Sequence, residues 1–214
     1  LLGAPPYGTR NNFRFFDLVK IGTPYILIHF GQIGYFRLSL VLLVFVADGK
    51  LIGEIAMTQL LLTSLLFFPT MLSQRYFLGK WHHIDFLSRW SLLREQIIVG
   101  VFINLALCLT LILFGENILV YLFNDKFEGV RASMYLFLPI LVLRTIVVPL
   151  IASSSRKHMK WKLSVALLLG AIGGGIASLA LVPILGIPGY FLSLVLAELG
   201  LLAVLGKHFI YGWR

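Results

Sequence analysis

The sequence predicts an all-α integral membrane protein, a bundle of six transmembrane helices. Of the 214 residues, 59% are hydrophobic and 13% are charged, whereas soluble domains are about 45–50% apolar and about 25% charged. Six apolar runs each reach about 20 residues, enough for a helix to cross roughly 30 Å of hydrocarbon. The basic residues fall in alternate connections between these runs. These three observations together place the chain in a membrane, crossing it several times.

The elements follow one another closely. Residues 1–16 are rich in Pro, Gly and Asn and predict a cytoplasmic linker, so the six-helix transmembrane domain is expected over 17–214. The predicted spans are about 18–46, 54–77, 92–114, 132–153, 162–183 and 188–210.

Two connections have a predicted form of their own. The last two spans are one apolar stretch that Pro183, Gly186, Pro188 and Gly189 divide into a tight hairpin. The segment Phe114–Gly129 is too short to span, and we expect it to lie along the outer surface as an amphipathic piece.

The loop charges orient the chain. The N-terminal segment, the loops after the second and fourth spans, and the C-terminus hold 13 of the 18 Lys and Arg. The alternate loops hold only Lys50, Lys126 and Arg131. By the positive-inside rule both termini are cytoplasmic. The net charge of +9 is explained by these basic loops, which would face the anionic lipid head groups of the membrane. No nucleic-acid partner is therefore expected.

Small and polar residues mark helix contacts. At four-residue spacing these are Ala166, Gly170, Gly174 and Ser178 in the fifth span, and Gln96, Gly100, Asn104 and Cys108 in the third. The first stripe predicts a close helix–helix contact, with a hinge as the alternative. In the second, we expect Asn104 to form an interhelical hydrogen bond. Cys108 is the single cysteine and so forms no disulfide within the chain.

Two arginines, Arg37 and Arg144, fall deep inside apolar runs. A charged side chain there costs on the order of 3 kcal/mol or more. One explanation is that an arginine pairs with Glu198, the one acid deep in the apolar part. The other is that both arginines face a water-filled cavity and bind an anionic substrate, since the guanidinium fork suits phosphate or diphosphate.

Three neutral polar residues complete the candidate substrate site. His29 and Gln32 share a broad face of the first span with Arg37, and Gln59 lies in the second span. The predicted substrate-binding residues are therefore Arg37, Arg144, His29, Gln32 and Gln59. No metal-spaced cluster, catalytic constellation or phosphate-binding glycine loop is present in the sequence, so neither an enzyme nor a cofactor is expected. The adjacent His82 and His83 predict solvated loop residues.

Three stretches carry a family resemblance. They are VADGKLIGEIAMTQLLLTSLLFFPTML at Val46–Leu72, the run Ile112–Leu163 into a basic turn, and LALVPILGIPGYFLSLVLAELGLL at Leu179–Leu202. In order and spacing the chain resembles the C-terminal half of bacterial polysaccharide flippases, the O-antigen (Wzx-like) transporters of the multidrug/oligosaccharidyl-lipid/polysaccharide exporter superfamily. Tyr190 departs from the pattern, which usually has a small residue there.

The resemblance implies one lobe of a MATE-like transporter with two six-helix lobes around a central cavity. The expected partners are the missing N-terminal lobe, membrane lipids and a polyprenyl diphosphate-linked oligosaccharide. The implied function is flipping of undecaprenyl-diphosphate-linked oligosaccharide across the bacterial inner membrane for lipopolysaccharide or other surface polysaccharide biosynthesis. A cation-coupled small-molecule exporter and a membrane-embedded polysaccharide polymerase or ligase remain alternatives. Cavity arginines of such flippases are thought to hold the lipid diphosphate, a role that falls here on Arg37 and, less directly, on Arg144.

Overall fold

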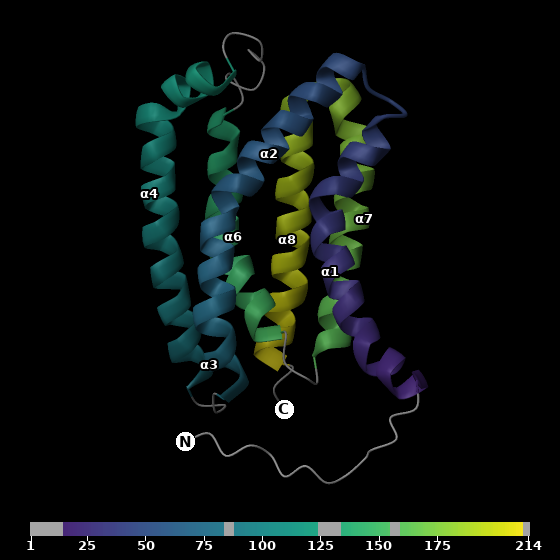
Figure 1. Ribbon diagram of the computed structural model, residues 1–214, viewed down its shortest axis with the longest axis vertical. Coiled ribbons are helices and arrows are strands. Elements are labelled where there is room, and N and C mark those ends of the chain that lie inside the picture. Colours follow the sequence, from purple (N-terminus) through teal and green to yellow (C-terminus); the bar gives the residue numbers. More distant parts are fainter. Residues whose placement is uncertain (1–14, 84–87, 124–133, 155–158, 212–214) are drawn as a thin grey trace.

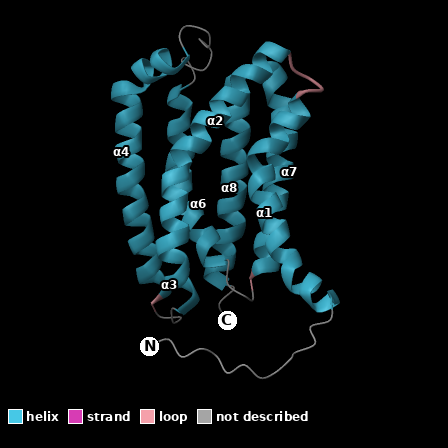
Figure 2. Ribbon diagram, viewed as in Figure 1, coloured by secondary structure: helices cyan, strands magenta, loops and turns pink. Residues whose placement is uncertain are grey.

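The structure, a computed structural model, describes residues 15–83, 88–123, 134–154 and 159–211. These residues form helices and turns, and no strand occurs among them. The helices are α1 (Phe15–Leu43), α2 (Gly49–Leu72) continued by a π-helical turn (Ser73–Phe77), α3 (Leu78–His83), α4 (Arg89–Phe123), α6 (Phe137–Ser154) after a 3-10 turn (Met134–Leu136), α7 (Lys160–Leu185) and α8 (Ile187–Tyr211). They stand side by side as an upright bundle (Figures 1 and 2).

Six of the described helices are long and apolar enough to cross a membrane, which confirms the predicted helical, multi-spanning character of the chain. Some boundaries differ from those predicted. The first helix ends at Leu43 instead of 46 because the amides of Phe45 and Val46 bond back to the carbonyls of Leu42 and Leu43 in a tight turn. The second helix begins at Gly49 instead of 54, since the amide of Ile52 bonds to the Asp48 carbonyl.

The predicted surface segment after the third span is continuous with that span. α4 runs through to Phe123, while its membrane-length part ends at Gly115. Figure 1 shows the last turns of α4 bending across the end of the bundle. Residues 124–129 of the predicted segment lie outside the described part of the chain, as do the linker residues 1–14 and the start of the predicted fourth span.

α1 and α7 run parallel in close contact, and small residues set their separation. A Cβ atom on Gly31 would lie 2.8 Å from the Cβ of Leu167, and one on Gly175 would lie 2.9 Å from Leu42. A side chain at Gly31 would force the helices apart because it would meet the Cβ and backbone of Leu167, whereas one at Gly175 would require the end of the Leu42 side chain to move. Glycine therefore allows α1 to lie along α7 over most of its length.

The predicted stripe on the fifth span faces α8. A Cβ on Gly170 would lie 3.1 Å from the Leu201 side chain, and one on Gly174 would lie 3.2 Å from the Cβ of Ala197. The stripe thus forms the close helix contact that the sequence predicted. The α7–α8 hairpin turns at Gly186, which has a φ of 64°, a left-handed conformation that favours glycine.

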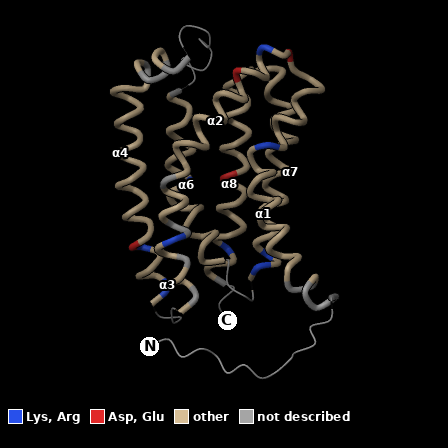
Figure 3. Tube along the Cα trace, in the orientation of Figure 1, with Lys and Arg blue, Asp and Glu red and all other residues tan. Residues whose placement is uncertain are grey.

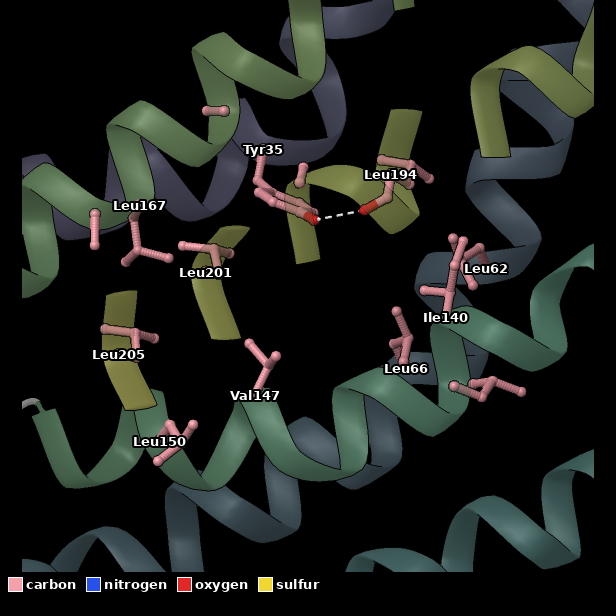
Figure 4. Close-up of a cluster of buried hydrophobic side chains, with 14 of the residues drawn as sticks. Tyr35, Leu62, Leu66, Ile140, Val147, Leu150, Leu167, Leu194, Leu201 and Leu205 are labelled. Atoms are coloured by element: carbon pink, nitrogen blue, oxygen red, sulfur yellow. Dashed lines mark hydrogen bonds between the residues drawn. The ribbon is translucent and has the colours of Figure 1, made fainter. Parts of the chain in front are cut away.

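The core lies where α1, α2, α6, α7 and α8 meet, and Figure 4 shows part of it. α6 packs along α8, while α4 packs mainly on α6 and leaves much of its surface exposed. The bundle thus has two groups of closely packed helices, α1 with α7 and α8, and α4 with α6, while α2 contacts helices of both groups. The α6–α8 contact is the largest between the groups.

We predict that Gly189→Ala destabilises the bundle by about 1–3 kcal/mol, the usual cost of overpacking. The new Cβ would lie 2.3 Å from the Leu181 carbonyl oxygen, and a backbone atom cannot move aside as a flexible side chain can. Gly173→Ala is the matched control because its Cβ meets no atom within 4 Å. The measurement is thermal unfolding of the purified protein in detergent. Equal midpoints for the two variants would show that the hairpin contact is looser than described.

Candidate functional site

An ion pair joins α6 to α8 in the centre of the bundle. The Nε atom of Arg144 lies 2.5 Å from Oε1 of Glu198. The Glu198 side chain is fully buried and that of Arg144 is 13% exposed. Of the two explanations for the buried arginines, the pairing with Glu198 therefore holds for Arg144.

Two aromatic rings of α1 enclose the same guanidinium. Its Cζ atom lies 5.0 Å from the ring centre of Tyr35 and 5.1 Å from that of Phe36, within the range of a cation–π interaction. The Tyr35 hydroxyl donates a 3.2 Å hydrogen bond to the carbonyl of Leu194, one turn before Glu198 on α8, and Figure 4 draws this bond. The charge pair thus lies where α1, α6 and α8 meet.

The pair leaves hydrogen-bonding capacity unused. The Nε and Oε1 atoms are at contact distance, but they are not aligned as a hydrogen bond, and Oε2 of Glu198 accepts none either. The two terminal nitrogens of Arg144 are not sealed from solvent and have no hydrogen-bond partner among the described residues. Glu198 thus neutralises Arg144 while the outer edge of the guanidinium stays free.

Arg144 is also one of the residues that line a pocket between α2, α4 and α6. The pocket is partly open, and its cavity volume is about 30 Å³, room for a water molecule or two. Its walls are mostly apolar, and its polar lining residues are Thr70, Gln96, Asn104, Arg144 and Thr145. A space of this size is a packing gap, far below the roughly 300–1,000 Å³ of small-molecule sites.

Asn104 forms the interhelical hydrogen bond that the sequence predicted. Its Nδ2 donates a 2.6 Å bond to Oγ1 of Thr145, whose hydroxyl donates a 3.1 Å bond to the Leu141 carbonyl. Gly100, one turn away on α4, lets the helices approach, since a Cβ there would lie 3.3 Å from the Thr145 methyl group. Asn104 is 5% exposed and its Oδ1 has no partner.

Arg37 has a different setting from Arg144. It is exposed, as are Ile26, Phe30, Ile33 and Val41 on the same face of α1. We call this face, together with the exposed His29, the outer stripe of α1. Tyr35, which contacts Arg144, lies roughly 200° around the helix from Arg37. The structure thus does not direct the two arginines to one surface.

The remaining candidates are spread over other faces. Gln32 is half-buried on α1. Gln59 on α2 is 6% exposed, and its Oε1 has no hydrogen-bond partner. No contact joins either residue to Arg37 or Arg144 among the described interactions. Their assignment to a substrate site stays a prediction.

The sequence interpretation missed the aromatic contribution. Tyr35 and Phe36 directly precede Arg37, yet their rings serve the other arginine. It also missed the bond from Trp81 Nε1 to Gln96 Oε1, at 2.8 Å, which ties α3 to α4. The polar side chain of Gln96, in the stripe of small and polar residues on the third span, indicated a contact with another helix. The sequence did not show which helix that would be.

Basic residues gather at the end of the bundle that holds α3 (Figure 3). Lys80 pairs there with Glu95 at 2.9 Å, and this hydrogen bond raises the pKa of the Lys80 ammonium group. Both side chains are more than a third exposed, so solvent screens the pair. His83 is exposed, as expected for a solvated histidine.

Searches against protein-family models, curated protein sequences and solved structures found no match to this chain. The resemblance to polysaccharide flippases therefore remains a prediction. In the described part of the chain, no three His, Cys, Asp or Glu side chains are grouped to hold a metal ion.

We predict strong coupling between Arg144 and Glu198. Glu198→Leu should destabilise the bundle by about 3–5 kcal/mol because it leaves a buried guanidinium without its counter-ion. The double variant Arg144→Leu/Glu198→Leu should lose less than the sum of the two single variants. The measurement is a double-mutant cycle of reversible unfolding in mixed micelles. Strict additivity would show that the two charges do not stabilise each other.

Proposed function

We propose that this chain takes part in flipping undecaprenyl-diphosphate-linked oligosaccharide across the bacterial inner membrane for surface polysaccharide biosynthesis. The observation that carries the proposal is the exposure of Arg37 within the membrane-length part of α1. An arginine that faces lipid there is costly, so the outer stripe of α1 is expected to face water, an anionic ligand or another protein segment. A transport cavity would meet this requirement.

The chemistry of the stripe suits a lipid diphosphate. Arg37 offers planar paired donors, and His29 lies about two turns earlier on the exposed side of the helix. The apolar residues between them, Phe30 and Ile33, can contact a polyprenyl chain. The stripe therefore combines a phosphate-binding cation with apolar surface, as a lipid-linked substrate requires.

The structure gives less support to a cation-coupled exporter. Such a transporter needs carboxylates in its cavity, and the deeply buried Glu198 is already neutralised by Arg144. The pair does not offer an open cation site. The anionic-substrate proposal is therefore the better supported of the two.

Substitution of Arg37 is the first test. Arg37→Ala and Arg37→Lys should both reduce surface polysaccharide and leave lipid-linked oligosaccharide in the cytoplasmic leaflet. Lysine keeps the charge but cannot form the paired hydrogen bonds, a loss of about 1.5–3 kcal/mol, or about 10- to 100-fold in affinity. The measurement is polysaccharide display together with leaflet accessibility of the lipid intermediate.

Two controls accompany this test. Arg94→Ala removes an exposed arginine at the basic end of α4 and should leave display unchanged. Protein abundance in the membrane should be equal in all variants. Arg37 is six residues from the end of α1, about 9 Å along the axis. Its side chain could therefore simply extend to the membrane surface, and in that role lysine would replace it. Full activity of Arg37→Lys would contradict substrate binding.

The proposed orientation has its own test. The basic end of the bundle, with Lys207, is placed in the cytoplasm and the turn at Asp48 in the periplasm. In a Cys108→Ser background, Asp48→Cys should react with a membrane-impermeant maleimide in cells with only the outer membrane opened. Lys207→Cys should react only after the inner membrane is also permeabilised. The reverse labelling pattern would invert the topology.

A further inference from the structure

A groove runs along the surface of the α7–α8 hairpin. Its cavity volume is about 280 Å³, close to the lower end of the roughly 300–1,000 Å³ of small-molecule sites. Residues of these two helices alone line it, and all of their side chains are apolar. Both helices are long and apolar enough to span a membrane. The groove is therefore suited to hold an apolar chain from the surrounding lipid.

Two glycines of the groove have no role in helix packing. Gly173 of α7 and Gly200 of α8 are exposed, and a Cβ atom on either would meet no atom within 4 Å. The contact between the helices accounts for the neighbouring Gly170, but it does not account for these two. The exposed side chains of Leu169 and Leu196 stand at the sides of the groove. The small residues thus leave an open space between larger apolar ones.

Two lysines continue the groove toward one end of the bundle. Lys162 lies four residues before Ala166 of α7, and Lys207 lies three residues after Val204 of α8. Each lysine therefore shares the helix face that lines the groove. α7 begins and α8 ends at the same end of the bundle (Figure 1). Both lysines are exposed, and both lie within electrostatic range of His208, which places their charges near each other.

No carboxylate in the described part of the chain offsets these two charges. Neither Lys162 nor Lys207 forms an ion pair or a hydrogen bond there. Lys160 differs, because its Nζ lies 3.8 Å from the ring centre of Tyr25. The exposed Trp161 next to Lys162 is typical of the head-group layer of a membrane. The two free ammonium groups are thus expected at the depth of lipid phosphates.

From this arrangement we propose that the groove binds one anionic phospholipid. Its phosphodiester lies between Lys162 and Lys207, and one acyl chain lies along Gly173 and Gly200. Lysine binds phosphate as a point charge, without the paired geometry that arginine requires. Basic pockets between membrane-spanning helices are suited to anionic lipid head groups. The site lies on different helices from the outer stripe of α1, so it is independent of the proposed transport function.

A second copy of the chain fits the groove less well than a lipid does. Two copies in one membrane have the same orientation, so a symmetric contact through the groove would bring both lysine pairs to the same end. Four positive charges without a described counter-ion would repel one another. A phospholipid instead supplies the missing negative charge together with the apolar chain.

The test is a native mass spectrometry titration of the purified protein in neutral maltoside micelles. The probes are phosphatidylglycerol, phosphatidylethanolamine with the same acyl chains, and glycerophosphoglycerol, which is the anionic head without chains. Phosphatidylglycerol should bind saturably at one site, at least about tenfold more tightly than either of the others. Equal affinity for the two lipids would overturn the proposal, as would equal affinity for the head alone.

Two double variants locate the site. Lys162→Gln/Lys207→Gln should lower the affinity for phosphatidylglycerol to that for phosphatidylethanolamine, because the charge contribution is lost. Gly173→Leu/Gly200→Leu should weaken binding of both lipids about tenfold by filling the groove. The helix contact should remain intact in this variant, since neither Cβ meets a neighbour. Unchanged binding of phosphatidylglycerol in either double variant would overturn the proposal.

Matched controls change the same residue types elsewhere. Lys50→Gln/Arg94→Gln removes two exposed charges, and Gly53→Leu fills open space beside α2; both should bind phosphatidylglycerol as the original protein does. Thermal unfolding identifies the folded variants, and binding is compared among these only. A dimer that the filled groove abolishes would assign the groove to a second copy and overturn the proposal. These readouts involve neither Arg37 nor polysaccharide display, so the two proposals fail separately.

Discussion

The Arg144–Glu198 ion pair is the interaction on which the arrangement of the helices depends most. It links α6 to α8 across the two helix groups of the bundle, and the rings of Tyr35 and Phe36 bring α1 to the same point. Neither charge would be tolerated there alone, because a buried lone ion costs several kcal/mol. The pair therefore specifies which helices meet more than it adds to stability, since an apolar replacement of both residues can be as stable.

Packing around this pair follows from the absence of a hydrophobic driving force between helices in lipid. Close approach of backbones and interhelical hydrogen bonds take its place. Gly31, Gly170 and Gly175 allow the first, and Asn104 with Thr145 provides the second. α4 has fewer close glycine contacts and packs against fewer helices than α7, and more of its apolar surface is exposed. The pocket lies beside α4, where the small-residue contacts are sparse.

The sequence could predict the six helices because long apolar runs allow few other structures in a membrane. It also indicated the α7–α8 hairpin from glycine and proline, and the Asn104 hydrogen bond from an amide in a stripe of small and polar residues within an apolar span. Tertiary partners were harder to predict. An ion pair with Glu198 was only one of two explanations for the buried Arg144. No sequence spacing relates positions 144 and 198, so the pair could not be chosen from the sequence. Tyr35 had no signal at all, since an aromatic residue in a span is ordinary.

The two intramembrane arginines show why the same residue type in a span cannot be assigned one role. A guanidinium is costly wherever it meets an apolar environment, and the structure deals with the two arginines in different ways. Arg144 has an internal counter-ion in Glu198, and its guanidinium lies against two aromatic rings of α1. Arg37 has no such enclosure and lies on the exposed stripe of α1, so its cost has to be offset by something outside this bundle. An enclosed and neutralised guanidinium suits a structural role, whereas an exposed and uncompensated cation suits an anionic ligand that is bound and released. The charge environment, more than the arginine itself, separates the structural ion pair of Arg144 from the candidate substrate residue Arg37.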